Sequence, residues 1–420
     1  MHKNKKKHII GIFIDLSKAF DTLDHSILIK KLENAGVRGS PLALLTSYLS
    51  NRLQYTSIDG FDSDQQIVTF GVPQGSVLGP LLFLLYIADI LNCHSTNDCE
   101  FVLYADDTNI FVIDVNRDLA IKKANDILKN VNNYMHCNLL HINLNKCCLI
   151  HFERKTRKSK NIIVNQNRNC IQVGDHVIKE VSETRFLGVT IDKNLTWILH
   201  IEKLRNKLKS ATGIIRRIRE FIPKEHLKSI YFALFESHMT YCISVWGGVG
   251  KTHIDKIFKI QKLCIRMLFG DAHKFMSKFI IPDVTQVSGE HKLDSEFYCK
   301  EHTKPLFNKQ AILAPHNAYK YHISLEILKI MKTRTPLAVF EKLNVSHRAE
   351  HNLIILGQYS NNFFFQGAKI WNTIIKKISP YMELINMNIG CFKLKLKKCL
   401  LGIQSEYDYD EWLPMNFSLD

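Results

Sequence analysis

The sequence predicts an α+β fold in its first part and a mainly helical fold in the rest. Apolar runs of strand length alternate with helical patterns up to about residue 155, as in a sheet covered by helices. Residues 156–198 hold short strands around a turn at Gly174, and we expect them to connect the two parts. From Leu199 onward apolar residues recur at helical spacing, which predicts helices.

Each expected element follows from the spacing of its apolar residues and from the residues at its two ends. Short apolar runs predict strands, and apolar residues at helical spacing predict helices bounded by caps or glycines. A loop rich in glycine and proline, Gly71–Pro80, leads into a buried helix. In chain order we expect strand Ile9–Ile14, helices Asp24–Gly36, Pro41–Leu49 and Leu81–Ile87, a hairpin of Phe101–Tyr104 and Thr108–Val112, helix Arg117–Tyr134, strand Cys147–Phe152, and helices Lys251–Leu268, Ser324–Lys332 and Phe363–Ile378.

Three carboxylates stand at the ends of predicted strands. Asp15 follows the first strand, and Asp106 and Asp107 lie where a tight turn joins the two strands of the hairpin. Carboxylates held at the tip of a hairpin suit a divalent cation. Acidic pairs are also common in plain turns, and an Asp after a strand often caps a helix, so these alternatives stay open. Asp15 and Asp106 are far apart in the chain, so only the fold can bring them together.

Three segments, in this order, resemble motifs A, B and C of the reverse transcriptases of non-LTR (LINE-type, jockey-like) retrotransposons. They are Phe13–Asp21, Gly71–Pro80 and Tyr104–Asp107. Leu144–Lys146 resembles motif D, although Cys147 stands where the family usually has Thr. Phe186–Asp192 resembles the segment that joins palm and thumb, and the resemblance thins beyond about residue 270.

The resemblance implies an RNA-directed DNA polymerase with a right-hand architecture. Residues 1–155 would form the palm, an antiparallel sheet with packed helices. Residues 156–198 would be the connection, 199–270 a helical thumb, and 271–420 a mainly helical region of unknown role. Such an enzyme joins deoxynucleoside triphosphates to a primer 3′-hydroxyl with the help of two metal ions.

The resemblance also implies roles for individual residues. Asp15, Asp106 and Asp107 would hold two Mg²⁺ ions, with Mn²⁺ as a substitute, and Mg²⁺ prefers such hard oxygen ligands. The Phe20 ring would lie under the sugar and exclude a 2′-hydroxyl, although a core aromatic is the plain alternative. Gln74 and Gly75 would contact the template–nucleotide pair. Lys146 would lie near the triphosphate, although most surface lysines are simply solvated.

The chain is strongly basic, with 56 Lys and Arg against 40 Asp and Glu and a formal charge of +16. Such a balance favours a polyanionic partner but does not choose between RNA, DNA and a membrane surface. On the helix after Leu199, an apolar face of Leu204, Leu208, Ala211, Ile215 and Ile218 lies beside a basic face of Arg205, Lys209, Arg216 and Arg219. We expect the basic face to contact nucleic-acid phosphates. A solvated face, and an interruption of the helix at Gly213, are the alternatives.

The expected partners are an RNA template, a DNA primer or target and deoxynucleoside triphosphates. Family members carry a fingers region and an endonuclease domain ahead of motif A, so we expect an N-terminally truncated protein. A nucleic-acid-binding remnant without activity, or a structural interaction protein, are the rival hypotheses. Eleven cysteines without a disulfide pattern, no secretory signal and no apolar run of membrane length indicate an intracellular protein, expected in nucleus and cytoplasm as a ribonucleoprotein.

Overall fold

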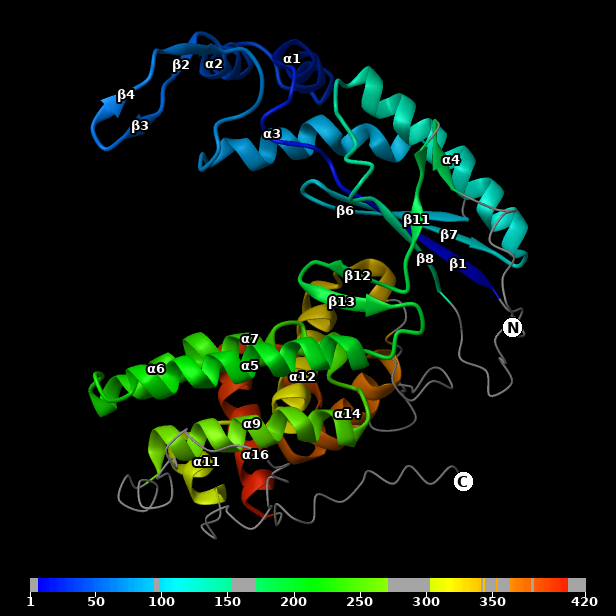
Figure 1. Cartoon of the computed structure of the whole chain (residues 1–420). Helices are drawn as coiled ribbons and strands as arrows, with labels where there is room; N and C mark the ends of the chain where they lie inside the picture. Colours follow the sequence, from blue (N-terminus) through cyan, green and yellow to red (C-terminus); the bar gives the residue numbers. More distant parts are fainter. Residues whose placement is uncertain are drawn as a thin grey trace, which may run out of the picture. The chain divides into compact units, whose positions relative to one another are not determined.

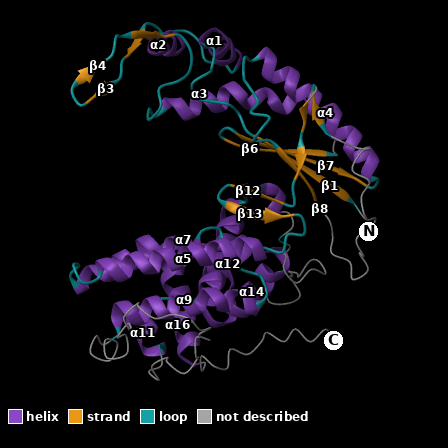
Figure 2. Cartoon of the chain, viewed as in Figure 1, coloured by secondary structure: helices purple, strands orange, loops and turns teal. Residues whose placement is uncertain are grey.

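The computed structural model shows a mixed α/β chain with one larger sheet and many helices (Figures 1 and 2). It describes residues 7–93, 98–152, 171–174, 176–270, 303–340, 343, 353, 363–378 and 381–406. The chain divides into two compact units, which we call unit 1 (residues 1–195) and unit 2 (residues 196–420).

Unit 1 contains all the described strands. They are β1 (His8–Ile14), β2 (Arg52–Gln54), β3 (Ser57–Ile58), β4 (Phe61–Asp62), β5 (Gln66–Val68), β6 (Cys99–Tyr104), β7 (Asp107–Asp114), β8 (Cys148–Phe152), β9 (Gln172–Val173), β10 (His176–Val177), β11 (Lys179–Glu180), β12 (Glu183–Phe186) and β13 (Val189–Asp192). Its helices are α1 (His25–Asn34), α2 (Ser40–Leu49), α3 (Leu78–Ile87), the 3₁₀ helix η1 (Ala88–Cys93) and α4 (Arg117–Cys137).

The five-stranded sheet has the order β11-β8-β1-β7-β6, so β1 lies at its centre. β1 runs antiparallel to both neighbours and pairs Ile10 with Val112 and Ile12 with Ile110. These four side chains are buried, and α4 packs against β1 and β7. Alternate residues of a strand face opposite sides, so this apolar set forms the face of the sheet that the helices cover.

The opposite face of the sheet carries aromatic rings. Phe111 contacts Phe13 with ring centroids 6.1 Å apart and Phe152 with centroids 6.3 Å apart. Gly11 lies between these rings, because a Cβ at this position would stand 2.9 Å from Phe152 and 3.1 Å from Phe111. Only glycine leaves the rings room to approach the central strand, and this constraint fixes the middle of β1.

Unit 2 is helical throughout its described residues. Its elements are α5 (Ile198–Ile218), the 3₁₀ helix η2 (Lys224–His226), α6 (Leu227–Tyr231), the π-helix η3 (Phe232–Glu236), α7 (Ser237–Thr240), α8 (Ile243–Trp246), α9 (Lys251–Phe269), α11 (Lys304–Gln310), α12 (Pro315–Thr333), α13 (Leu337–Phe340), α14 (Phe363–Ile378), α15 (Tyr381–Asn386) and α16 (Ile389–Glu406). α5 packs against α9, and the two helices share a core with Tyr231, Phe235 and Trp246.

The predicted helices and strands are confirmed in type and order, and some of their bounds differ. The loop of the hairpin is Ala105–Asp106, and Asp107 already belongs to β7. α5 continues through Gly213 without interruption, because its buried face holds the helix on both sides. α12 begins at Pro315, nine residues before Ser324, since proline suits the first turn of a helix. The connection predicted for 156–198 falls partly outside the described residues.

Within the described residues, no helix combines the length and the apolar character that crossing a membrane requires.

Candidate active site

The first predicted carboxylate lies at the exit of the central strand. Asp15 directly follows β1, and its backbone oxygen accepts a hydrogen bond from the backbone N–H of Asn143 at 2.8 Å. Leu16 then forms an isolated bridge with Ile142. These backbone bonds hold the chain on both sides of Asp15, so the position of the carboxylate is set by the sheet itself.

The hairpin places its carboxylates beside this exit. β6 and β7 pair Tyr104 with Asp107, which leaves Ala105 and Asp106 as a two-residue loop. Ala105 has a φ of 51°, as the first position of a type II′ turn requires, and an alanine there is strained. β7 also pairs Thr108 with Ile14, so Asp107 and Asp15 are neighbours just beyond the last paired residues. The fold therefore brings the three predicted carboxylates to one end of the sheet.

Electrostatics shows that these carboxylates interact. Burial raises the pKa of Asp107, and the negative charges of Asp106 and then Asp15 raise it further. Oδ2 of Asp15 is buried and accepts no hydrogen bond from the described residues. A buried carboxylate oxygen without a donor and two neighbouring carboxylates form a locus that a cation stabilises.

A lysine supplies one positive charge at this place. The Lys146 ammonium lies 3.4 Å from Oδ2 of Asp15, and its side chain is 68 % exposed. Because solvent screens an exposed pair, this contact contributes little to stability. The sequence predicted Lys146 near a triphosphate, and the structure places it against the first carboxylate, where its charge can meet an anionic ligand.

Cys147 departs from the family pattern and lies at the same place. Its side chain is buried and lies beside the Asp15 backbone. Burial raises the pKa of the thiol, which keeps it protonated at neutral pH. Sequence reasoning noted the departure but did not show that Cys147 supports Asp15.

The glycine- and proline-rich loop is joined to the turn after β1 by backbone hydrogen bonds. The Gly71 N–H donates to Leu23 O at 2.8 Å, and the Val72 N–H donates to Phe20 O at 2.9 Å. Gly71 has a φ of +82°, and a Cβ here would stand 2.8 Å from backbone atoms of Asp21. Only glycine allows this approach, which holds the loop against the first motif.

The side chain of Gln74 is engaged within the protein. Its Nε2 donates to Oδ1 of Asp21 at 2.7 Å, so this bond links the two motifs. Gly75 has a φ of +80° and open space around it. The sequence indicates that Asp21 and Asp24 are structural or helix-starting acids. Asp24 caps α1, and Asp21 accepts the hydrogen bond that orients Gln74.

Phe20 is half-buried and packs on Phe83 of α3, with ring centroids 4.6 Å apart. Phe83 is fully buried, so Phe20 forms an edge of the core of unit 1. This contact agrees with the plain core alternative for Phe20. It also leaves part of the ring accessible, so the role against the sugar stays a prediction.

The three carboxylates can supply some, but not all, of the ligands of a divalent ion. Within the described ranges, no group of three or more His, Cys, Asp and Glu side chains is arranged as a complete metal-binding set. Mg²⁺ is usually held by one or two carboxylates together with waters and substrate phosphates. Oδ2 of Asp15, which accepts no hydrogen bond from the described residues, and the raised pKa of Asp107 are the two observations that suit such an ion.

The four basic residues predicted on α5 divide into two pairs. Arg205 donates to Glu202 at 2.7 Å, and Arg219 donates to the Met267 carbonyl at 2.7 Å near the end of α9. Both therefore have structural partners in unit 2. Lys209 and Arg216 are exposed. The apolar face of α5 is buried as predicted, except that Ile218 is only half-buried.

Comparison with known proteins agrees with the predicted family. Residues 1–191 match the family described as reverse transcriptase (RNA-dependent DNA polymerase). The chain is 26 % identical over 276 residues to the RNA-directed DNA polymerase from mobile element jockey of Drosophila melanogaster, which covers 63 % of this chain. It is 24 % identical over 272 residues to the probable RNA-directed DNA polymerase from transposon BS of the same organism, again over 63 % of this chain.

The match spans about 29 % of the length of each of these relatives. Among solved structures, apo telomerase from Candida tropicalis superposes with a TM-score of 0.35 and 12 % identity, covering 79 % of this chain and 52 % of that chain. Residues 1–191 thus match the reverse transcriptase family, and the chain is similar in sequence to the RNA-directed DNA polymerases of jockey-like mobile elements.

Proposed function

We propose that this chain is the palm and thumb part of an RNA-directed DNA polymerase of a non-LTR retrotransposon. In this proposal unit 1 is the palm, and α5 to α9 belong to the thumb. One observation carries it: the exit of β1 and the β6–β7 hairpin bring Asp15 beside Asp107 and Asp106 at one end of the sheet. The substrates would be an RNA template, a DNA primer and deoxynucleoside triphosphates.

Asp15, Asp106 and Asp107 would hold Mg²⁺, or Mn²⁺ in its place. When bound, a pair of such ions stabilises the attacking and leaving oxygens of a phosphoryl transfer. The carboxylates supply the negative charge that binds the ions, and the sheet fixes their position before substrate arrives. Lys146 adds a positive charge beside Asp15 that can meet the phosphates of an incoming nucleotide.

The remaining residues would select and orient the substrates. Phe20 would present its accessible edge to the sugar and disfavour a 2′-hydroxyl by contact. Gln74 and Gly75 would approach the template–nucleotide pair, with Gln74 oriented by Asp21. On α5, Lys209 and Arg216 are exposed and would contact the phosphates, while Glu202 and the Met267 carbonyl hold Arg205 and Arg219.

Primer extension on an RNA template tests the proposal directly. We expect Mg²⁺-dependent synthesis that falls by at least about a hundredfold in Asp15→Asn and in Asp106→Asn, because each change removes a negative charge that binds the ions. Asp126→Asn is the matched control, since Asp126 is exposed on α4. Full synthesis in Asp106→Asn would disprove the assigned role.

A second candidate function is nucleic-acid binding without synthesis. It is favoured by the formal charge of +16 together with the incomplete metal-binding set. It predicts binding to labelled RNA that weakens steeply as salt rises, since each phosphate contact releases counterions. Binding of this kind with no primer extension under any metal condition would select this alternative, and extension by the wild type would reject it.

A further inference from the structure

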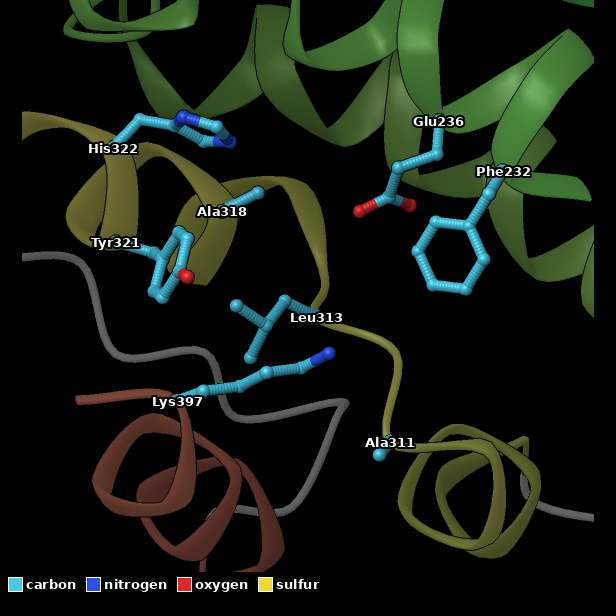
Figure 3. A pocket seen from close by; sticks show the side chains of 8 residues that line it. All are labelled: Phe232, Glu236, Ala311, Leu313, Ala318, Tyr321, His322 and Lys397. Carbon is cyan, nitrogen blue, oxygen red and sulfur yellow. The ribbon is translucent and has the colours of Figure 1, made fainter. Parts of the chain in front are cut away.

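A cavity of about 150 Å³ lies within unit 2. Side chains from η3, from the α11–α12 connection, from α12 and from α16 line it, and none of them belongs to the site proposed above (Figure 3). An engineered protein cavity of about the same volume holds a benzene molecule. The space therefore suits one six-membered ring.

One wall of the cavity carries a carboxylate. Figure 3 shows the Glu236 carboxylate directed into the cavity. Its Oε2 accepts a hydrogen bond from the Tyr231 hydroxyl at 2.6 Å, and that hydroxyl accepts one from Gln261 Nε2 at 2.8 Å. Oε1 accepts no hydrogen bond from the described residues. The carboxylate is enclosed by protein, although the residue as a whole keeps some exposed surface. The bond to Oε2 thus holds the carboxylate in place, and Oε1 can accept a hydrogen bond from a ligand.

Another wall carries an ammonium group. Lys397 of α16 lines the cavity, and its Nζ lies 6.0 Å from the centroid of the Phe232 ring. Lys397 forms no ion pair within 4 Å among the described residues, yet its charge is close enough to lower the pKa of Glu236. A ligand between the two groups can donate to the carboxylate and accept from the ammonium.

The remaining walls are apolar or aromatic. Leu313 and Ala318 are buried, and Tyr321 closes one side (Figure 3). Phe232 and Glu236 come from the two ends of the π-helical turn η3, a rare form of helix that occurs frequently at functional sites. Such walls can pack against the faces of a flat ring, while Glu236 and Lys397 can bind polar groups at its edge.

Basic side chains flank the cavity. His322 lines it, and the charges of Glu326, Lys329 and Lys393 all act on His322. Lys329 is ion-paired with Glu326 at 3.2 Å, which leaves Lys393 as the basic group for a ligand. Lys393 is exposed and stands one helical turn before Lys397 on the same face of α16. Exposed lysines beside the cavity suit the phosphate attached to a nucleotide.

We propose that this cavity binds a single unpaired cytosine base of a single-stranded nucleic acid, with its amino group on Glu236, its ring acceptors toward Lys397 and its phosphate beside Lys393. Unpaired bases are commonly recognised in this way, by hydrogen bonds to their edge and by contact with aromatic side chains. The inference rests on the proposed function only in taking the chain to bind nucleic acid.

Cytosine fits better than the other bases for two reasons. With its ring acceptors toward Lys397, cytosine places an amino donor on Glu236, whereas uracil in the same orientation would place its O4 carbonyl there. Purines have a second ring, which exceeds the space for one six-membered ring.

Equilibrium dialysis of the full chain with cytidine monophosphate and uridine monophosphate tests the inference. The buffer contains no divalent metal and is held at about pH 8, where Glu236 is ionised. We expect the wild type to bind the cytidine form at least about tenfold more tightly. Glu236→Gln is expected to remove this preference, and Ala318→Leu is expected to fill the cavity and remove it as well. The exposed Glu225→Gln serves as the matched control and is expected to keep the preference.

An oligocytidylate and an oligouridylate of equal length then separate a strand-bound base from a free nucleotide. Preference for the oligocytidylate supports the inference. A preference for cytidine seen only with the monophosphates overturns the inference that the base belongs to a strand. Equal binding of the two monophosphates, or no binding of either, overturns the whole inference. A preference that survives both Glu236→Gln and Ala318→Leu also overturns it. The assay needs neither metal nor synthesis, so a failure of the polymerase proposal appears in primer extension and not here.

Discussion

The buried carboxylate of Glu236 predicts a pH-dependent stability of unit 2. Burial raises the pKa of Glu236 from 4.5 to about 7, even though the Tyr231 hydroxyl and the Lys397 charge favour its ionised form. The folded chain then keeps a proton that the unfolded chain releases, so stability falls as pH rises from about 4.5 to about 7. At about 1.4 kcal/mol for each pKa unit, the full loss is about 3.5 kcal/mol, of which about 2.5 kcal/mol falls between pH 5 and pH 8.

Glu236→Gln isolates this contribution, because glutamine keeps an acceptor for the Tyr231 hydroxyl but does not titrate. Urea unfolding followed by tryptophan fluorescence reports on unit 2 alone, since the four tryptophans, at positions 197, 246, 371 and 412, all lie after residue 195. We expect the wild type to lose about 2.5 kcal/mol relative to the variant between pH 5 and pH 8. Glu225→Gln, which changes an exposed glutamate, should follow the wild type. Parallel pH profiles of the wild type and Glu236→Gln would refute the reasoning.

Three further predictions concern the proposed polymerase site and the basic helix. Gly71→Ala should destabilise unit 1 by about 2 kcal/mol or more, because φ is +82° and the new Cβ would stand 2.8 Å from backbone atoms of Asp21. Hydrogen exchange should detect this loss of stability. In the control Gly36→Ala, where φ is also positive but the space is open, the loss should be only about 1 kcal/mol. Phe20→Val should raise the incorporation of ribonucleotides relative to deoxynucleotides in primer extension, and an unchanged ratio would leave the ring only its core role. Lys209→Ala should lower the magnitude of the slope of log affinity against log salt by about 0.7 for single-stranded RNA, and an unchanged slope would remove Lys209 from the interface.

The sheet elements of unit 1 were predictable because each was encoded locally. Apolar runs of strand length predicted β1, β6, β7 and β8, and helical spacing predicted α1 and α4, although α4 ends at Cys137 rather than at Tyr134. Element ends were less certain. Asp107 was expected in the turn but lies in β7, because a two-residue loop is enough once Ala105 adopts a positive φ.

Roles that depend on partners distant in the chain were less predictable. Arg205 and Arg219 look like two more members of a basic face, but Glu202 and the carbonyl of Met267 occupy them. The bond from Gln74 to Asp21 joins residues from two motifs, and no local pattern announces it. In the same way the cavity of Glu236 is assembled from helices that are remote from one another in sequence.

The amino-acid sequence by itself determined the resemblance to reverse transcriptases, the order of the elements and the three candidate carboxylates, because those properties depend on residue type and on spacing along the chain. The tertiary structure alone decided that the charge of Asp15 raises the pKa of Asp107, that Lys146 forms an ion pair with Asp15, and that Glu236 is buried near Lys397. Electrostatic interaction and desolvation depend on distances through space, and folding sets those distances.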